Sequence, residues 1–199
     1  MKDHIVFSVG PDDRWSRHSE GSFLRLRDGR IMLLYSRFTS RCADDAPSDL
    51  AAAYSSDEGE HWTEPVTAIR AAQWGVENIM SVTLMRMRDG SVGAYYIIKA
   101  DAGISKIMLS RSYDEGGSWT RHTECTLPDR RGYYVLNNDR VERLSTGRLV
   151  MPLTFHRGGH QTDGSVYFDG RGVAVFLLSD DDGETWREAA DTGRADGLC

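Results

Sequence analysis

The sequence predicts an all-β protein, a β-propeller built from four-stranded antiparallel blades. An eight-residue phrase, Ser-x-Asp-x-Gly-x-x-Trp, occurs three times in 199 residues, at 55–62, 112–119 and 179–186. A strand–turn–strand pattern precedes each copy, and no segment shows a helical period of comparable strength. A fixed phrase that recurs at intervals of tens of residues indicates a repeat architecture.

The phrase has the composition of a turn that closes on itself. The carboxylate of Asp57, Asp114 or Asp181 can accept bonds from backbone N–H groups of its own turn, and the Gly two residues later supplies the positive φ. The Trp can then pack back onto the sheet as an apolar plug. We therefore expect these aspartates to hold turns and not to take part in chemistry.

Each repeat is expected to contain four strands in chain order. Strands one and two flank a tight turn, and Asp-Gly between alternating apolar runs is a strong hairpin signal. These turns are Asp28-Gly29, Asp89-Gly90 and Thr146-Gly147. Strand three precedes each phrase, at 50–55, 107–111 and 173–178. A less regular fourth strand follows each Trp, near 64–68, 121–126 and 187–190.

The spacing of the repeats favours propeller blades. Asp114 follows Asp57 by 57 residues, and Asp181 follows Asp114 by 67. This suits four-stranded blades with one expanded loop, at about 14–70, 77–127 and 133–192. A β-sandwich gives no reason for the repeat, and solenoid repeats are normally shorter.

Three blades do not close a ring, because propellers close with about four to eight. The open arc leaves an exposed edge, and residues 191–199 run past the third blade without a closing strand. We expect the N-terminal half of a six-bladed propeller in a longer chain. If the chain is this short, pairing through the exposed blade edge is the alternative.

Composition limits the classes of partner. The net charge of −6 and the lack of a basic stretch exclude a typical nucleic-acid binder. Arginine supplies 21 of the 24 basic residues, which suits bidentate recognition of carboxylates but is also common in high-GC genomes. The cysteines, at 42, 125 and 199, form no disulfide framework or zinc motif, and we expect no metal or cofactor.

The sequence also bears on location. Residues 1–5 contain no long apolar stretch of a secretory leader, and nothing approaches the length of a membrane span. The cytoplasm is the default prediction. A secreted or periplasmic location is the alternative if a leader has been trimmed.

The predicted topology separates a turn face from a site face. If strand one descends, its hairpin and the phrase after strand three both lie on the bottom. The top then consists of the starts of the first strands and the loops between strands two and three. The polar residues of these segments are Arg17, Glu20, Arg37, Asp44, Asp45, Glu77, Asn78, Asn138, Asp139, Arg140, His156 and His160. Polar groups converging at the mouth of a propeller channel are the default site hypothesis.

The repeated turns resemble the Asp-box signature of the sialidase (neuraminidase) superfamily. The order of 18–21, 78–85 and 137–141 also resembles bacterial sialidase-like proteins of the BNR-repeat group. The similarity runs across essentially the whole chain. It implies a retaining exo-sialidase, a glycoside hydrolase that removes terminal sialic acid from glycoconjugates.

The resemblance implies roles for individual residues. Arg17 takes the place of the first arginine that holds the substrate carboxylate, although Ser16-Arg17-His18-Ser19 replaces the usual aromatic-Arg-Ile-Pro context. Arg37 takes the place of a second arginine, and Asp44 that of the general acid/base, favoured over Asp45 by its spacing to Leu50. The remaining candidate substrate contacts are Glu20, Asn78, Asn138, Arg140 and His156.

Each role has a simpler alternative. Arg17 can form a blade-linking salt bridge, Glu20 can pair with Arg17, and Asp44 can be a solvated loop residue. Asn138 and Arg140 can satisfy backbone groups between blades. The Tyr nucleophile, its activating Glu and the other arginines are expected from later blades, so this chain alone should be inactive. The competing functions are another glycosidase or lyase-like relative on the same propeller, and a non-catalytic carbohydrate- or protein-binding propeller.

Overall fold

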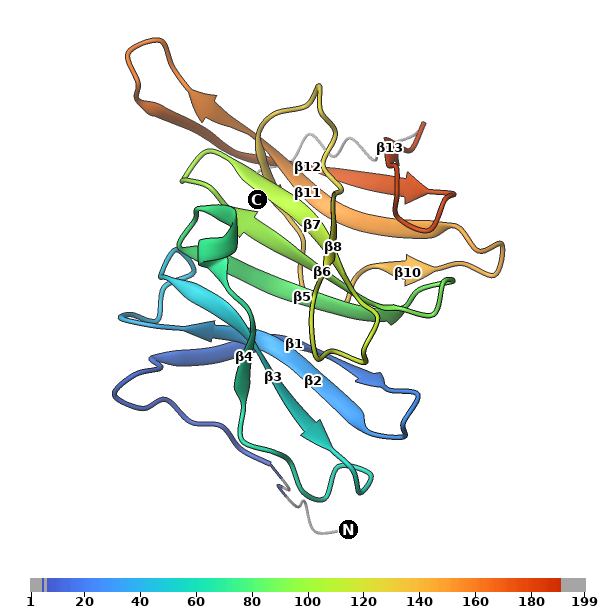
Figure 1. Ribbon diagram of the computed structural model, residues 1–199. Coiled ribbons are helices and arrows are strands. Elements are labelled where there is room, and N and C mark those ends of the chain that lie inside the picture. Colours follow the sequence, from blue (N-terminus) through green and yellow to red (C-terminus); the bar gives the residue numbers. More distant parts are fainter. Residues whose placement is uncertain (1–4, 6, 191–199) are drawn as a thin grey trace.

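The computed structural model describes residue 5 and residues 7–190, and this part of the chain is all-β, with one short 3-10 helix, η1 (Ala71–Trp74) (Figure 1). No helix in the described part is long and apolar enough to cross a membrane. The strands are β1 (Arg17–Arg25), β2 (Ile31–Phe38), β3 (Ser48–Ser55), β4 (Val66–Ile69), β5 (Asn78–Arg86), β6 (Val92–Lys99), β7 (Ser105–Ser112), β8 (Arg121–Glu124), β9 (Tyr133–Val135), β10 (Glu142–Arg143), β11 (Leu149–His160), β12 (Val166–Ser179) and β13 (Arg187–Glu188).

The strands form three consecutive antiparallel units. β1–β4 pair in chain order, β5–β8 do the same, and a single parallel bridge, Ser48 to Asn78, joins these two units in one sheet. The third unit is a separate sheet in which β11 pairs with β9, β10 and β12, and β12 pairs with β13. The hairpins expected at 28–29, 89–90 and 146–147 are all present. The predicted end of the third blade, at 192, lies outside the described residues, as does the tail 191–199.

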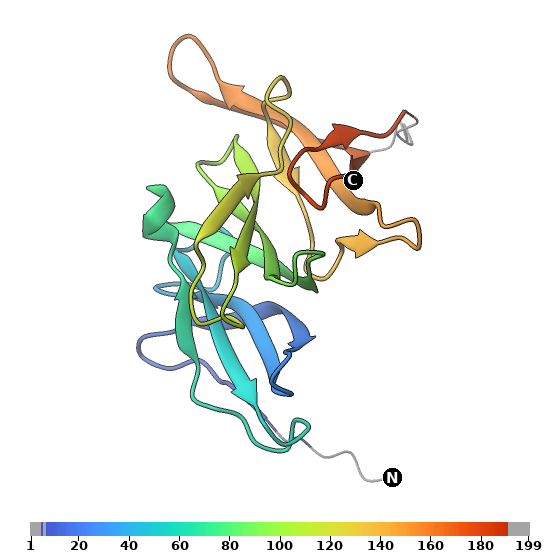
Figure 2. The same cartoon turned by 45° about the vertical axis from the view of Figure 1, so that its right-hand side comes forward.

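Two apolar cores lie between adjacent units and join them. One joins the first and second units through side chains such as Leu34, Leu50 and Tyr96, all fully buried. The other joins the second and third units through Leu109, Leu149 and Leu177. Figure 2 shows the three units side by side, each turned relative to the next. Burial between units therefore holds the fold together, as expected for repeats that cannot bury both faces alone.

The three Asp phrases close by the same hydrogen bonds. Asp57 Oδ1 accepts the N–H of His61 at 2.9 Å, and the equivalent carboxylates accept from 118 and 185 at 2.8 and 2.9 Å. The Ser at the start of each phrase is 1% exposed and accepts the N–H of the Gly. Those glycines have φ of 94°, 92° and 93°, which a side chain would strain. The turn-forming role expected for these aspartates is confirmed, and the buried Ser is an additional element of the turn.

In the second and third phrases the acidic residue before the Gly couples its unit to the preceding one. Glu115 accepts the backbone N–H of Arg27 at 2.9 Å, and Asp182 accepts that of Arg88 at the same distance. Arg111, 2% exposed, donates to the carbonyl of Asp182 at 2.6 Å. The phrases therefore do more than close their own turns: they attach successive units to one another.

The third unit departs from the prediction between its second and third strands, where a loop was expected. β11 and β12 continue as a hairpin that pairs His156 with Gly172 and His160 with Val166 (Figures 1 and 2, orange). We call residues 156–172 the arm. It projects beyond the neighbouring strands, because β11 and β12 have 12 and 14 residues whereas β2, β3, β6 and β7 have eight each.

Loops and hairpins sort onto two opposite edges. In Figure 1 the β2–β3 loop, the β6–β7 loop and the tip of the arm lie on the left, whereas the β1–β2, β5–β6 and β10–β11 hairpins lie on the right. The left edge corresponds to the face on which the sequence places the candidate site.

Candidate active site

The centre of the candidate site is an ion pair between Arg17 and Asp44. Arg17 begins β1, and its guanidinium lies 4.4 Å from the centre of the Phe38 ring. Its Nη1 donates to Asp44 Oδ1 at 2.6 Å and to the carbonyl of Cys42 at 2.9 Å. The bond to Asp44 is the main cause that lowers the pKa of this carboxyl. In this state Asp44 is an ionised partner of Arg17.

The loop that carries Asp44 is fastened from the second unit. The Asn78 side-chain amide donates to the carbonyls of Asp44 and Ala46 at 3.0 and 2.5 Å. Lys99 Nζ, at the end of β6, donates to the carbonyl of Asp44 at 2.7 Å. Asn78 is 4% exposed, so its position is fixed by packing. Its amide group holds the loop in place, and its Oδ1 is buried without a described partner.

Glu20 supplies a second carboxylate with the opposite electrostatics. Its carboxylate lies 3.9 Å from Arg17 Nη2 and accepts from Ser81 Oγ at 3.3 Å. Burial is the main cause that raises its pKa, and the negative charge of Asp44 adds to the rise. Two carboxyl groups beside one guanidinium therefore have pKa values shifted in opposite directions. Glycosidases use this arrangement to assign a proton donor and an ionised partner.

The backbone at Glu20 is strained, and the same strain recurs in the other units. Glu20, Ser81 and Asp139 have φ of 55°, 63° and 56°, each at an irregular point of the first strand or its approach. Ser22 Oγ donates to Asp139 Oδ1 at 2.9 Å. Non-glycine residues in the left-handed region cost about 1–3 kcal/mol each and concentrate at functional sites. Here they turn polar side chains toward one another where the three units meet.

Two further candidates in the third unit have structural contacts. The Asn138 amide donates to the carbonyl of Gly21 at 3.3 Å, which links the third unit to the first. The backbone N–H of Arg140 donates to Thr83 Oγ1 at 3.0 Å, and its side chain is exposed. Asn138 thus satisfies a backbone group between units, whereas the Arg140 guanidinium has no partner among the described residues.

Arg37 does not join this cluster. It is 5% exposed, its guanidinium lies 3.8 Å from the centre of the Trp15 ring, and it donates to Thr67 Oγ1 at 2.6 Å. Successive residues of a strand point to opposite faces. Since Arg17 lies over Phe38, the preceding residue Arg37 faces the other side of β2. Its placement suits a structural role on that side of the first unit.

His156 lies among aromatic side chains at the base of the arm. Its ring stacks on Phe168 with centres 5.1 Å apart, and Phe168 meets Tyr133 edge-on at 5.6 Å. Burial raises the pKa of Tyr133, and the charges of Asp44 and Asp45 add to the effect. Tyr133 of this aromatic cluster is therefore close enough to the Asp44 loop for the charges of that loop to affect its pKa. His160, farther along the arm, bonds Asp101 at 2.8 Å.

The structure separates Asp44 from Asp45. Asp45 pairs with the exposed side chain of Arg41 at 3.2 Å, so it does not contact Arg17. Lys99 and Tyr133 belong to the surroundings of Asp44, although neither belongs to a motif. The only sequence feature that could have indicated Lys99 as part of the site is its position at the end of the second strand of its unit, on the predicted site face. Burial lowers the pKa of Lys99, while the neighbouring carboxylates oppose that effect.

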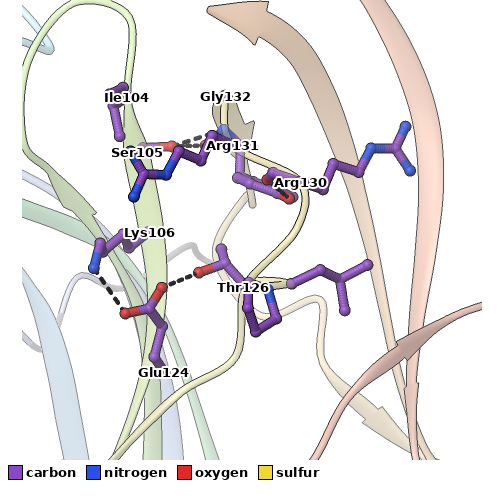
Figure 3. A pocket seen from close by; sticks show the side chains of 11 residues that line it. Ile104, Ser105, Lys106, Glu124, Thr126, Arg130, Arg131 and Gly132 are labelled. Carbon is purple, nitrogen blue, oxygen red and sulfur yellow. Dashed lines mark hydrogen bonds and ion pairs between the residues drawn. The ribbon is translucent and has the colours of Figure 1, made fainter. Parts of the chain in front are cut away.

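Two hollows are lined by residues other than Arg17 and Asp44. A cavity of about 330 Å³ lies between β7, β8 and the segment 126–134 (Figure 3). In it Lys106 pairs with Glu124, which also accepts from Thr126. A second hollow of about 290 Å³ is lined by Glu20, Phe23 and Tyr35. The described residues contain no group of three or more His, Cys, Asp or Glu side chains that could hold a metal ion.

Comparison with known proteins places the fold among glycoside hydrolases. No family model and no curated protein matches the chain. Among solved structures, a protein of unknown function from Dyadobacter fermentans is 17% identical with a TM-score of 0.65, and the match covers 91% of this chain and 56% of that one. NanB sialidase from Streptococcus pneumoniae is 12% identical with a TM-score of 0.65, covering 95% and 46%. An endo-arabinase from Bacteroides thetaiotaomicron is 13% identical with a TM-score of 0.60, covering 96% and 67%.

These similarities define the fold and its extent. The structural neighbours are sialidases and other glycoside hydrolases, so the chain has a glycosidase-like fold. The chain spans about half the length of the first of these neighbours. At 12–17% identity the likeness to these structures is one of fold.

Proposed function

We propose that this chain is part of a sialidase-type glycoside hydrolase that cleaves terminal sialic acid from glycoconjugates. The carrying observation is the Arg17–Asp44 pair, a guanidinium and a carboxylate 2.6 Å apart on one edge of the sheet. The proposal includes the propeller: the units 14–70, 77–127 and 133–192 are three blades of six. The repeated units and the sialidases among the structural neighbours support it.

In this proposal Arg17 holds the carboxylate of sialic acid. A guanidinium fork binds a carboxylate through two charge-assisted hydrogen bonds, and Arg17 Nη1 already donates one hydrogen bond to a carboxylate of the protein. The substrate must therefore compete with Asp44. Asp44 has a side chain 67% exposed, so its release from Arg17 into the loop requires little rearrangement.

Substrate binding would then prepare the acid. When the sialic acid carboxylate replaces Asp44 on Arg17, Asp44 loses the contact that lowers its pKa and gains a negative neighbour. Both changes favour its protonated form. Protonated Asp44 can donate a proton to the leaving oxygen and later take one from water. The ion pair of the free protein becomes a means of producing the acid only when a carboxylate substrate is bound.

The surrounding residues would position this exchange. Asn78 and Lys99 hold the backbone of Asp44 and keep the loop in place while its side chain moves. Glu20, Asn138, Arg140 and His156 remain proposed substrate contacts. Sialidases use a Tyr nucleophile and not a second carboxylate, and the resemblance implies that this Tyr comes from units outside these three. The proposed partner is a sialoglycoconjugate or other carbohydrate, and the cytoplasm remains the predicted location.

A second candidate function is hydrolysis of a neutral glycoside. The observation that favours it is the pairing of Arg17 with two carboxylates, Asp44 and Glu20, with pKa values lowered and raised. Glycosidases that act on neutral sugars use such a pair as acid and base or nucleophile. In that case Arg17 tunes the carboxylates and has no need to release Asp44.

Binding of free sialic acid distinguishes the candidates. We expect Arg17→Ala to weaken binding by about 10- to 150-fold, since a hydrogen bond to a charged group contributes about 1.5–3 kcal/mol. Arg41→Ala is the matched control: Arg41 lies in the same loop, pairs with Asp45 and should leave affinity unchanged. Equal affinities of the two variants would remove the support for the sialidase proposal.

Turnover gives the second arm of the test. A fluorogenic sialoside and a neutral arabinofuranoside are offered to this chain and to the longest polypeptide that contains it, each with and without Asp44→Asn. The sialidase proposal expects the longer polypeptide to turn over the sialoside alone, with that turnover lost in Asp44→Asn, and it expects this chain by itself to be inactive. Turnover of the arabinofuranoside alone supports the second candidate. Binding without any turnover supports a non-catalytic carbohydrate-binding protein.

A further inference from the structure

The cavity of about 330 Å³ lies where the second and third units join, and neither Arg17 nor Asp44 lines it (Figure 3). One wall is the start of β7. The other wall is the segment 124–134, which leads from the end of β8 into β9. Both walls belong to units that the structure describes, so this chain alone forms the cavity.

Hydrogen bonds to β7 fasten the segment at both ends. At one end the Cys125 N–H donates to the carbonyl of Ile107 at 2.8 Å. At the other end the Ser105 N–H donates to the carbonyl of Gly132 at 3.2 Å, and Ser105 Oγ accepts the N–H of Tyr134 at 2.7 Å. Ser105 and Tyr134 are each 2% exposed. The segment therefore arches over a space that is already formed before any ligand arrives.

Much of the lining is apolar. It includes the side chains of Ile104, Leu127 and Pro128 and the ring of Tyr134. The Tyr134 hydroxyl already donates to the carbonyl of Arg130 at 2.6 Å. Ligand pockets of about 300–1,000 Å³ typically combine such a lining with a few placed polar groups. The cavity lies at the lower end of this range, which suits a ligand with a single ring.

The polar groups of the cavity form one small network. Lys106 Nζ donates to Glu124 Oε2 at 2.8 Å, and Thr126 Oγ1 donates to Glu124 Oε1 at 2.7 Å (Figure 3). An ammonium group has three donors, and each carboxylate oxygen has two lone pairs. Lys106 therefore keeps donors, and Glu124 keeps acceptor sites, that a ligand can use. The contacts within the network also hold both side chains in place.

Arg131 adds a positive charge that the protein does not neutralise. Its side chain is exposed and has no hydrogen bond or ion pair among the described residues. Figure 3 shows it extending across β7 on the side of Lys106, whereas Arg130 points the other way. Arg130 is occupied, because it pairs with Glu188 and lies over the Phe155 ring. The guanidinium of Arg131 is thus free to bind a carboxylate through two hydrogen bonds.

We propose that this cavity binds a sugar acid, a ring that carries a carboxylate and hydroxyl groups. Arg131 and Lys106 hold the carboxylate, a hydroxyl group donates to Glu124, and the apolar face of the ring packs on Leu127 and Pro128. Each part of this ligand class meets a group of matching chemistry in the lining.

The cavity lies on the same sheet edge as the Asp44 loop. Ser105 pairs with Lys99 across β6 and β7, and Lys99 holds the carbonyl of Asp44. The cavity is nevertheless a separate site, with its own cations and its own walls. This inference concerns ligand binding and does not rest on the proposed activity.

Titration with glucuronate, followed through the amide NMR signals of the chain, tests the proposal. We expect glucuronate to shift the signals of 104–107 and 124–134. Glucose lacks the carboxylate and should bind about tenfold more weakly or worse, because hydrogen bonds to charged groups are the strong ones. Arg131→Gln and Lys106→Gln should each weaken glucuronate binding by a similar factor. Both side chains are exposed, and circular dichroism verifies that the variants are folded.

The matched control is Arg157→Gln, which removes another exposed arginine without an ion pair among the described residues and should leave the affinity for glucuronate unchanged. Equal affinities of wild type and Arg131→Gln would overturn the proposal. Signal shifts confined to the surroundings of Arg17 and Asp44 would also overturn it, and would assign glucuronate to the candidate active site. Inorganic phosphate bound as tightly as glucuronate would show a cationic surface only and no sugar-acid site.

Discussion

Replacing Ser112 with Ala removes a single hydroxyl group but should destabilise the protein substantially. The Ser112 hydroxyl is buried, accepts the N–H of Gly116 at 2.8 Å and donates to Asp114 Oδ1 at 2.7 Å. In Ser112→Ala the Gly116 N–H remains buried without an acceptor, since the left-handed turn points it at the missing hydroxyl. An unsatisfied buried donor costs about 1–3 kcal/mol.

The effect is large enough to measure by ordinary unfolding. With roughly 2 kcal/mol lost, Tm should fall by about 4–8 °C for a domain of this size. Urea unfolding followed by circular dichroism gives the free energy directly. Ser118→Ala is the matched control: its hydroxyl bonds the same aspartate at 2.7 Å but is exposed, so water replaces it and the loss should stay below about 1 kcal/mol. Equal losses for the two variants would refute the role assigned to the buried Ser.

Three further predictions concern the carboxylates. Arg17→Gln should raise the pKa of Asp44, because the hydrogen bond from Arg17 is the main cause that lowers this pKa. NMR titration of the carboxyl group measures the change. A pKa of Asp44 that is the same in the variant and in wild type would contradict the pairing with Arg17. Asp57 has a pKa lowered from 3.8 to about 2, so the stability that its carboxylate contributes is fully present above pH 3.8 and is lost as the pH falls through about 2. The Tm difference between wild type and Asp57→Asn should shrink over that pH range. A Tm difference that stays constant would contradict this role of the carboxylate. Glu20→Gly should raise the free energy of unfolding by about 0.5–1 kcal/mol, because Gly adopts φ of 55° without strain, and reduced stability would show that the Glu20 contacts outweigh the strain.

The local features of the fold could be predicted from the sequence. Asp-Gly turns and the Asp phrases depend on contacts within a few residues, so their chemistry is visible in the chain itself. The coupling role of Glu115 was missed because its partner, Arg27, lies 88 residues away. The arm was missed because the glycine-rich segment 157–159 resembles a loop, although it pairs as a strand.

The candidate site could also be predicted only in part, because some of its contacts depend on which way a side chain faces and on how distant strands pair. The resemblance to sialidases pointed to Arg17 and Asp44, and the structure places them in contact. It also pointed to Arg37, which faces the opposite side because a strand alternates its side chains and Arg17 lies over the next residue, Phe38. Lys99 gave little signal, because only the β3–β5 register brings the end of β6 beside the Asp44 loop.

The contact between the arm and the β6–β7 loop determines which residues of the arm can be substituted. A side chain at Gly158 would collide with the carbonyl oxygen of Gly103, and one at Gly103 would lie 2.8 Å from Val166. Two backbones therefore touch directly where the arm crosses the β6–β7 loop. The angle of the arm is set by the absence of side chains at these two glycines. An exposed residue of the arm such as Tyr167 can then be exchanged without moving the support that carries it.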